Sequence, residues 1–398
     1  MIMPRGRRRS ACGMASVWAL ASALELVLPP AASAEAPVQA EVVYTADLAQ
    51  PIRGGADRKL RYLDNLDLVA EADLDALVGW HGARAHGYVL VNNGAHPNTA
   101  AGSLEGVNNI EVGKAGVRLF EAWAEQDIGS RGALLVGLYD LNSEFYALES
   151  AGLLLGPPFG IGTELAATGR NGPSIFPSSA LAVRANLRLG EGESYVRVAA
   201  FNAHAATLGD PGGVDFGFHD GLLLIGEGGL GRQHARLSLG LWAYTRAREA
   251  YYSDPADPDP QRRHARGAYV QGEFQLPGAG ESAFQAFVRA GFSRGGTTPF
   301  AWSASAGLFR APVLAARPGS SASLGVHYAG TGRSFRQEAR ALGQFPASSE
   351  YTLEATYSDR LADWLTVQPD LQLVCHPGGL RGAPAALIGT VRLTLTLP

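Results

Sequence analysis

The chain has 398 residues, of which 46% are hydrophobic and 18% charged, and its formal net charge is −4. This composition is too apolar for a disordered protein and too weakly charged for a nucleic-acid-binding protein. Fifty glycines, with threonine, valine and aromatic residues scattered through short segments, predict many turns and short strands and argue against a helical bundle.

The first segment, residues 1–34, has the pattern of a secretory signal peptide. Four arginines between positions 5 and 9 precede an apolar run from about Met14 to Leu28, and Ala32-Ser33-Ala34 supplies a small-residue cleavage site. We therefore expect export and removal of residues 1–34. A retained membrane anchor is the alternative, but the apolar run is short for a membrane-spanning helix.

After this segment the sequence alternates with period two between turn residues, the pattern of half-buried β-strands. The clearest case is 387–397, where Val391, Leu393 and Leu395 share one face while Thr390 and Arg392 lie on the other. The same alternation occurs at 181–188, 195–201, 235–244, 268–275 and 284–292. No segment beyond the first supplies the roughly 20 uninterrupted apolar residues of a membrane helix, so any membrane protein here must be a barrel.

The alternating segments favour an outer-membrane β-barrel over a soluble β-sandwich or barrel. Soluble strands also alternate, but these segments reach about 9–11 residues, the span of a tilted transmembrane strand. At about 22 residues per strand and connection, the chain would form an antiparallel barrel of near 16 strands with an open aqueous lumen. We expect residues 35–65 to form an N-terminal periplasmic segment and residues 66–398 to form the barrel.

Several ordered motifs resemble those of the OprB-type carbohydrate-selective porins, from about Leu66 to the end of the chain. These motifs are 121–126 (Glu-Ala-Trp-Ala-Glu-Gln), 137–145, 158–160, 174–177, 180–184, 195–202, 351–357, 364–372 and 377–379. The chain departs from the family pattern at His376, where members carry Asn, and at Pro398, where an outer-membrane protein usually ends in an aromatic residue. No family motif is evident from about 295 to 344.

The resemblance implies a 16-stranded barrel in the Gram-negative outer membrane. Monosaccharides and similar small hydrophilic solutes would diffuse through it passively, with no cofactor, metal or catalysis. The expected partners are sugars, outer-membrane lipid, the barrel-insertion machinery and further copies of the chain in a homo-oligomer; nucleic acid is not expected.

The channel lining follows from strand alternation and from sugar chemistry. Sugars carry many hydroxyls and no charge, so a constriction needs donors such as guanidinium and acceptors such as carboxylate, without binding too tightly for release. Aromatic rings supply flat surfaces for sugar rings. The inward-facing candidates are Arg184, Arg188, Arg197, Arg236 and Arg289, the acidic residues Glu121, Glu125, Asp140 and Glu144 on the early strands, and the aromatic residues Tyr195, Trp242 and Tyr244. The alternative is that inward charges only keep a wide pore wet and pair with one another.

Three other functions stay open at this point. A non-selective general diffusion porin would share the same fold. An outer-membrane barrel enzyme of lipase or acyltransferase type would need a Ser or Thr beside a His on the lipid-facing rim. A secreted β-domain that binds polysaccharide would have a closed, dry core.

Motifs for catalysis and metal binding find little support. Asp254, Asp257 and Asp259 could hold calcium, although their proline-rich segment is more typical of a solvated loop. The sequence has no HExxH, GxSxG or P-loop motif.

Overall fold

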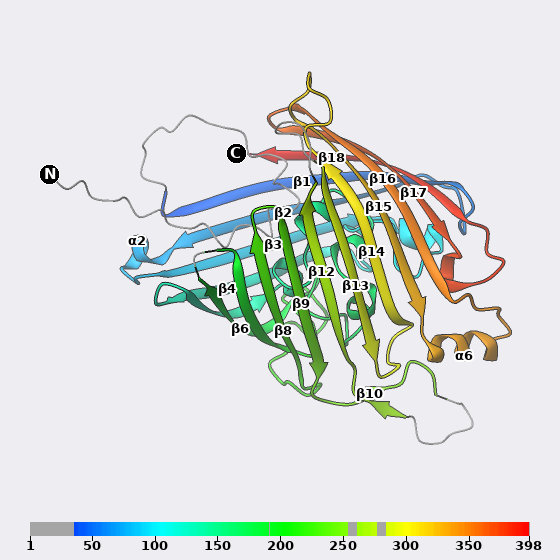
Figure 1. Ribbon diagram of the computed structural model, residues 1–398, viewed down its shortest axis with the longest axis horizontal. Coiled ribbons are helices and arrows are strands. Elements are labelled where there is room, and N and C mark those ends of the chain that lie inside the picture. The colour runs from blue at the N-terminus through cyan, green and yellow to red at the C-terminus, as the bar shows by residue number, and fades with distance from the viewer. Residues whose placement is uncertain (1–35, 191, 254–260, 277–283, 398) are drawn as a thin grey trace.

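The computed structural model describes residues 36–190, 192–253, 261–276 and 284–397, and sixteen strands of this part close into one antiparallel barrel (Figure 1). The fold class and strand number expected from the sequence are confirmed. The barrel strands are β1 (Val38–Arg53), β2 (Arg61–Asp73), β3 (Ala83–Gly94), β4 (Gly116–Ile128), β5 (Gly132–Tyr139), β6 (Ala180–Leu189), β7 (Ser194–Asn202), β8 (Leu222–Arg232), β9 (Ala235–Tyr244), β12 (Arg266–Gln275), β13 (Gln285–Arg294), β14 (Phe300–Arg310), β15 (Ser320–Thr331), β16 (Ser349–Ala362), β17 (Leu365–Cys375) and β18 (Ala386–Leu397).

Shorter elements lie in the connections. β10 (Arg248–Glu249) and β11 (Arg262–Arg263) form a separate two-stranded sheet between β9 and β12. The helices are α2 (Leu74–Val78), α3 (Pro97–Ala101), α4 (Pro157–Gly160), α5 (Thr163–Ala166) and α6 (Arg333–Ala341), and the 3-10 turns are η2 (Leu141–Ser143), η3 (Glu149–Ala151) and η4 (Pro377–Gly379). No helix in the described part of the chain is long and apolar enough to cross a membrane. The expected signal peptide, the three aspartates in 254–260 and Pro398 lie outside the described residues.

The barrel begins earlier in the chain than the sequence predicts. β1 lies between β2 and β18 and pairs with both, so most of 35–65 belongs to the wall and not to a separate periplasmic segment. Its pattern is that of a wall strand, since Asp47 and Ala49 are buried inside while Leu48 and Ile52 are exposed. The physical reason is closure: without β1, the last strand would keep an unpaired edge.

The predicted alternation is confirmed in the wall. On β18, Val391 and Leu393 are 43% and 40% exposed, whereas Thr390 and Arg392 are buried. The same holds on β9, where Leu241 is exposed and Trp242 is buried. Exposed apolar side chains therefore cover the outer surface of the barrel, and polar side chains face inward.

The two ends of the barrel differ in the length of their connections. Short turns join β4 to β5, β6 to β7, β8 to β9 and β16 to β17, and β1 begins and β18 ends on the same side. The other end carries the long connections 95–115, 140–179, 203–221 and 245–265. Outer-membrane barrels have short periplasmic turns and longer extracellular loops. We therefore name these the periplasmic end and the extracellular end.

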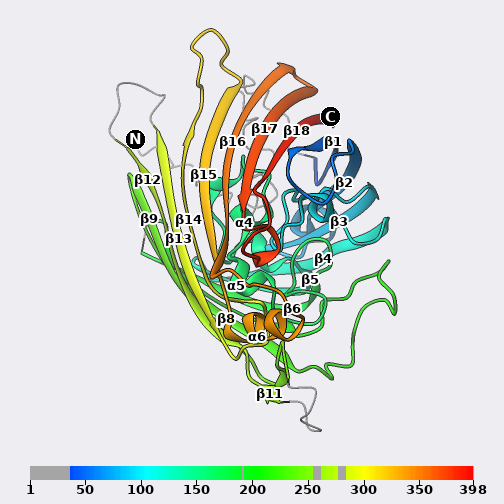
Figure 2. The same ribbon diagram turned by 90° about the vertical axis from the view of Figure 1, so that its right-hand side faces the viewer.

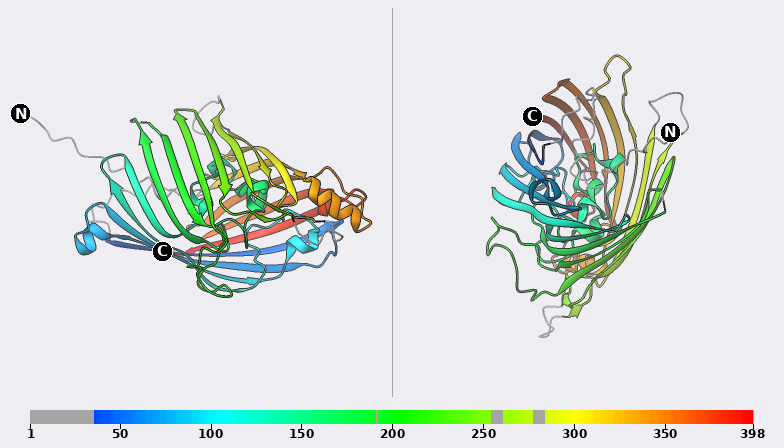
Figure 3. Two further views of the ribbon diagram at one scale, coloured as in Figure 1. Left: turned by 90° about the horizontal axis from the view of Figure 1, so that it is seen from below. Right: turned by 90° about the vertical axis from the view of Figure 1, so that its left-hand side faces the viewer.

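The connection 140–179 between β5 and β6 folds back into the barrel and carries η2, η3, α4 and α5 (Figure 2, Figure 3). We call it the constriction loop. Its apolar side chains pack on the inner wall, where Phe145 and Leu165 join Phe201 and Trp242 in one buried cluster. A second cluster places Leu154 and Phe159 against Phe287 of β13. The core of the protein thus lies between the loop and the wall.

Candidate channel constriction

Arginine and glutamine side chains of the wall hold the backbone of the constriction loop. The guanidinium of Arg289 on β13 donates to the carbonyl oxygens of Tyr146 (3.0 Å), Gly160 (3.0 Å) and Phe159 (2.5 Å). Gln271 donates to Ala147 O at 2.9 Å, and Gln368 donates to Leu153 O at 2.7 Å. Because backbone carbonyls buried away from water need donors, these contacts fix the path of the loop.

Carboxylates of the wall accept hydrogen bonds from the loop's backbone N–H groups. Glu227 accepts from Tyr146 N at 3.0 Å and from the hydroxyls of Tyr195 and Tyr269, both at 2.6 Å. Glu354 on β16 accepts from Leu155 N and, at 3.0 Å, from Gly156 N. The loop is therefore held on opposite sides of the barrel by ionisable side chains that point inward.

A second connection, 95–115 between β3 and β4, also enters the barrel and is tied to the constriction loop. Its Glu105 lies 2.7 Å from His327 Nε2, and Thr163 donates to the same carboxylate at 2.7 Å. Glu350 accepts from Leu104 N at 3.0 Å. His327 and the Glu105 side chain are fully buried, so this contact joins both loops to β15.

Opposite charges alternate along the wall between β3 and β7. Arg84 lies 2.5 Å from Glu125, and Arg184 lies 2.7 Å from both Glu125 and Glu144. Arg197 donates to the backbone oxygen of Glu144 at 2.5 Å. We call these five residues the charged row; it runs from the wall onto the constriction loop.

Glu144 is the member of the charged row that lies on the loop and not on a strand. Burial acts to raise the pKa of its carboxyl, but the positive charges of Arg197 and Arg184 and the hydrogen bonds from Tyr139 and Arg184 outweigh burial. The pKa of Glu144 therefore lies below its usual value of 4.5. It is held as a carboxylate at neutral pH.

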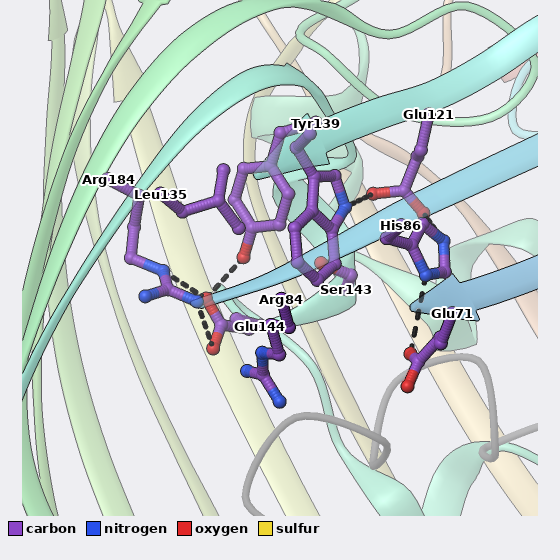
Figure 4. Close-up of a pocket in the computed structure, with 10 residues that line it drawn as sticks. Glu71, Arg84, His86, Glu121, Leu135, Tyr139, Ser143, Glu144 and Arg184 are labelled. Carbon is purple, nitrogen blue, oxygen red and sulfur yellow. Dashed lines mark hydrogen bonds and ion pairs between the residues drawn. The ribbon is translucent and has the colours of Figure 1, made fainter. Parts of the chain in front are cut away.

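A pocket opens beside the charged row, where η2 approaches the wall (Figure 4). It is lined by Glu71, Arg84, His86, Glu121, Trp123, Leu135, Tyr139, Ser143, Glu144 and Arg184. In Figure 4, Arg184 and Tyr139 point toward Glu144, and His86 points toward Glu71. The side chains of Arg84 and Glu71 are 34% and 30% exposed, so a donor and an acceptor face the free lumen here.

An aromatic pair forms one side of the pocket. The rings of His86 and Trp123 stack with centroids 4.7 Å apart and planes 8° apart. The indole nitrogen of Trp123 donates to Glu121 at 3.2 Å, and the guanidinium of Arg84 lies 5.8 Å from the Trp123 ring centroid. Within the described residues, Arg84 Nε and Arg184 Nη1 are buried and have no hydrogen-bond acceptor. The half-buried ring of Trp123 thus lies beside the partly exposed side chains of Arg84 and Glu71, and a flat ring with a donor and an acceptor is the chemistry that polyhydroxyl solutes need.

The structure brings together only part of the predicted lining. Glu121, Glu125, Glu144 and Arg184 meet at or beside the pocket, although Glu144 lies on the loop and not on an early strand. Asp140, also beyond the end of β5, caps η2 by accepting from Asn142 N at 2.8 Å. The pKa of Asp140 is raised well above its usual value by burial and by the charge of Glu121.

The remaining candidates lie elsewhere in the barrel. Arg197, Arg289 and Tyr195 contact the constriction loop or its anchoring carboxylate, as described above. Arg236 lies 2.9 Å from Glu149, and Arg188 donates to Ser130 O at 2.8 Å near the periplasmic end. Trp242 and Tyr244 face inward but are only 3% and 2% exposed, because the constriction loop covers them. They offer no surface to a sugar.

Sequence reasoning missed Glu71, Arg84, His86 and Tyr139 as pocket residues. The alternation of Arg84, His86 and Tyr88 on β3 carried a signal for the inward face, but β3 showed no family motif. Trp123 stood between two glutamates in a family motif, and the structure turns it inward beside Glu121.

Among the described residues, no group of three or more His, Cys, Asp or Glu side chains is arranged to hold a metal ion.

Comparisons with solved structures agree with this architecture. The structure of Pseudomonas putida OprB at high pH superposes with a TM-score of 0.80, at 20% identity over 91% of this chain and 94% of that one. The outer membrane channel DcaP of Acinetobacter baumannii gives a TM-score of 0.58 at 12% identity, covering 90% of this chain and 97% of that one. OmpT of Vibrio cholerae, in a trimer form, gives 0.53 at 9% identity, covering 90% and 100%. These likenesses show the fold.

The family comes from a sequence comparison. No curated protein matches the chain significantly. The family model described as "Carbohydrate-selective porin, OprB family" matches residues 57–397, which include fifteen of the barrel strands within the described residues and both loops that enter the lumen. This match identifies a channel and not an enzyme. The chain belongs to the OprB family of carbohydrate-selective porins, outer-membrane barrels through which carbohydrates diffuse.

Proposed function

We propose that sugars cross this porin beside the stacked Trp123 and His86, and that the pocket there sets the preference for carbohydrates. The observation that carries the proposal is the arrangement around the ring pair. Arg84 and Glu71 keep exposed polar atoms on the lumen side, and Glu144 closes the pocket from the constriction loop. A sugar ring placed there would stack on the half-buried ring of Trp123, and its hydroxyls would exchange hydrogen bonds with water for hydrogen bonds with Arg84 and Glu71.

The mechanism is passive diffusion through a polar constriction. Hydroxyls that lose water bonds at the narrow point regain partners from the guanidinium of Arg84 and the carboxylate of Glu71. Because most charged groups in the row already pair with each other, no strong net charge holds a solute in place. Weak, replaceable contacts let the sugar leave on the far side.

The test is solute flux through the refolded protein in liposomes. For the unaltered protein we expect faster swelling with glucose than with neutral amino acids or small anions of matched size. Trp123→Ala should reduce the glucose rate and this preference by about two- to tenfold, the size of an aromatic stacking contribution. Trp364→Ala, at an exposed tryptophan in the periplasmic turn after β16, is the matched control and should change neither.

Two outcomes would contradict the proposal. Equal rates for all solutes in the unaltered protein would leave a general diffusion porin. An unchanged preference in Trp123→Ala would move the selective contact away from the ring pair.

We also propose export by a cleaved signal peptide, residues 1–34, insertion by the outer-membrane barrel-insertion machinery, and assembly of several copies in the lipid bilayer. The trimer form of OmpT supports the last point by likeness of fold. N-terminal sequencing of the protein extracted from membranes checks the cleavage. Cross-linking before extraction checks the assembly, and a monomer alone would contradict it.

A further inference from the structure

Two arginines lie directly opposite each other on the outer surface at the extracellular end. Arg266 is the first residue of β12 and Arg294 is the last residue of β13, and the two lie opposite each other in the antiparallel strand pair. Both are exposed. Strand alternation turns them outward, because they share their faces with Val270 on β12 and with Val288 and Phe292 on β13, which are 51%, 47% and 47% exposed.

A row of outward-facing aromatic rings beside the arginine pair indicates where the pair lies relative to the membrane surface. Phe292 is the ladder partner of Trp302, and the rings of Trp302 and Tyr328 stack with centroids 4.8 Å apart. Tyr328 in turn lies opposite Tyr351 on β16. Aromatic residues of this kind mark the membrane–water interface of outer-membrane barrels. Arg294 lies two residues beyond Phe292, about 7 Å farther toward the extracellular side.

Within the described part of the chain, no carboxylate pairs with either arginine. Like charges directly opposite each other in a ladder repel. The other ladder partner of Arg266 is Ala243, which carries no charge. Among the described residues, neither Arg266 nor Arg294 forms an ion pair with a carboxylate, in contrast to the inward arginines of the charged row. Two adjacent guanidinium groups at this height are complementary to an anion that carries more than one negative charge.

We propose that Arg266 and Arg294 bind the phosphorylated headgroup of a lipid in the outer leaflet of the membrane. The acyl chains would lie along the exposed apolar surface of β12 and β13, below the aromatic row. The phosphate oxygens would accept from both guanidinium groups, as arginine pairs commonly bind phosphate. This site is on the outside of the barrel and does not depend on the pocket proposed for sugars.

The test measures lipid retention by native mass spectrometry of the whole mature protein in detergent. The probe is lipid A with two phosphates, compared with the same lipid after both phosphates are removed. The Arg266→Gln/Arg294→Gln variant should retain the phosphorylated lipid about thirtyfold more weakly, since each basic side chain near an anionic lipid surface contributes roughly a factor of five. Added salt should weaken retention by the unaltered protein.

The matched control is Arg232→Gln, an exposed arginine at the periplasmic end of β8 whose ladder partner is Ala235. It should retain the lipid like the unaltered protein. All variants should keep heat-modifiable mobility and the glucose swelling rate, which shows that the barrel has folded and separates this site from the sugar pathway.

Three results would overturn the proposal. Equal retention of the phosphorylated and dephosphorylated lipids would show that only the acyl chains bind. Equal retention by the double variant would remove the two arginines. Displacement of the lipid by inorganic phosphate at equal concentration would identify a site for free phosphate and not for a lipid headgroup.

Discussion

The inward-facing arginines of this barrel have two roles: buried ones hold the constriction loop, and partly exposed ones present donors to the lumen. Arg289 is 2% exposed, and its guanidinium donates to carbonyl oxygens of the constriction loop, so it maintains the structure of the constriction. Arg84 has a side chain that is 34% exposed and keeps donors toward the lumen. Arg184 lies between these cases, since it holds Glu144 and also lines the pocket. Strand alternation alone cannot distinguish them.

Protonation of the single residue Glu144 at acidic pH should weaken the attraction of its carboxylate to Arg184 and Arg197 and so loosen the constriction loop. Because its pKa is lowered in the folded protein, its stabilising contribution is complete above the usual value of 4.5 and is lost as the pH falls through the folded value. We expect single-channel conductance to rise or become noisy below about pH 4.5 as the loop loosens. Planar-bilayer recordings from neutral to acidic pH measure it.

Glu144→Gln supplies the comparison, because it should remove the change below 4.5. Glu164, on the same loop, has a pKa raised by burial, so it takes up its proton at higher pH and its effects fall above that range. A Glu144→Gln channel that kept the full acid response would assign the response to another group.

At the scale of elements, the constriction loop fits the barrel because the facing wall is built from small residues. A methyl group added at Gly325 would lie 2.6 Å from the Phe159 ring, and one added at Gly291 would lie 2.0 Å from the Glu164 carboxylate. Buried serines such as Ser303 and Ser305 continue this surface on β14. The wall from β13 to β15 is therefore a preformed seat for α4 and α5.

Gly291→Val should push the loop from this seat. We expect a larger single-channel conductance and a weaker preference for glucose, while the barrel still folds, because the strand itself tolerates valine. Gly228→Val is the control: Gly228 lies on the outer surface of β8, and its nearest neighbour is the Tyr195 carbonyl oxygen at 4.0 Å. Equal conductance of the two variants would show that the seat does not position the loop.

At the scale of the whole molecule, the closure between β1 and β18 contains a buried ion pair. Asp47 and Arg392 are ladder partners, and Arg392 donates from Nε and Nη2 to the two carboxylate oxygens, each at 2.8 Å. Asn108 from the second inner connection donates to Asp47 at 2.6 Å. The pair thus links the closing strands to a loop inside the lumen.

Arg392→Met should destabilise the barrel by about 3–5 kcal/mol, because it leaves the carboxylate of Asp47 buried and unpaired. Urea unfolding followed by heat-modifiable mobility measures the change. Adding Asp47→Asn in the same chain should restore much of the loss, since no uncompensated charge then remains. A single variant as stable as the unaltered barrel would contradict a role of the pair in closure.

Period-two alternation predicted a barrel and the inward face of β6, β7, β9, β12, β13 and β18, because burial on one face of a strand is a local property of the sequence. The strand number came from the chain length and from the family resemblance. The predicted boundary was wrong at β1, because β1 belongs to the wall through its pairing with β18, whose residues lie more than 300 positions away in the chain.

The site was harder to predict than the fold. Glu121, Glu125, Glu144 and Arg184 were found from charge and position. The roles of Trp242 and Arg289 were decided by a loop whose path depends on contacts with strands from β6 to β17. No local pattern in 140–179 states which wall it will meet. The sequence pattern predicts whether a side chain points into the barrel, but it does not predict whether a loop then packs over that side chain.

The pairing of the first strand with the last has a consequence for biogenesis. Until β18 has been synthesised and exported, β1 has no partner on one side, so the growing sheet keeps two bare edges that can pair with other chains. The longest-range contacts of the molecule must therefore form last, and topologies of this kind fold slowly. The barrel therefore cannot close before the last residues of the chain have reached the same compartment as the first.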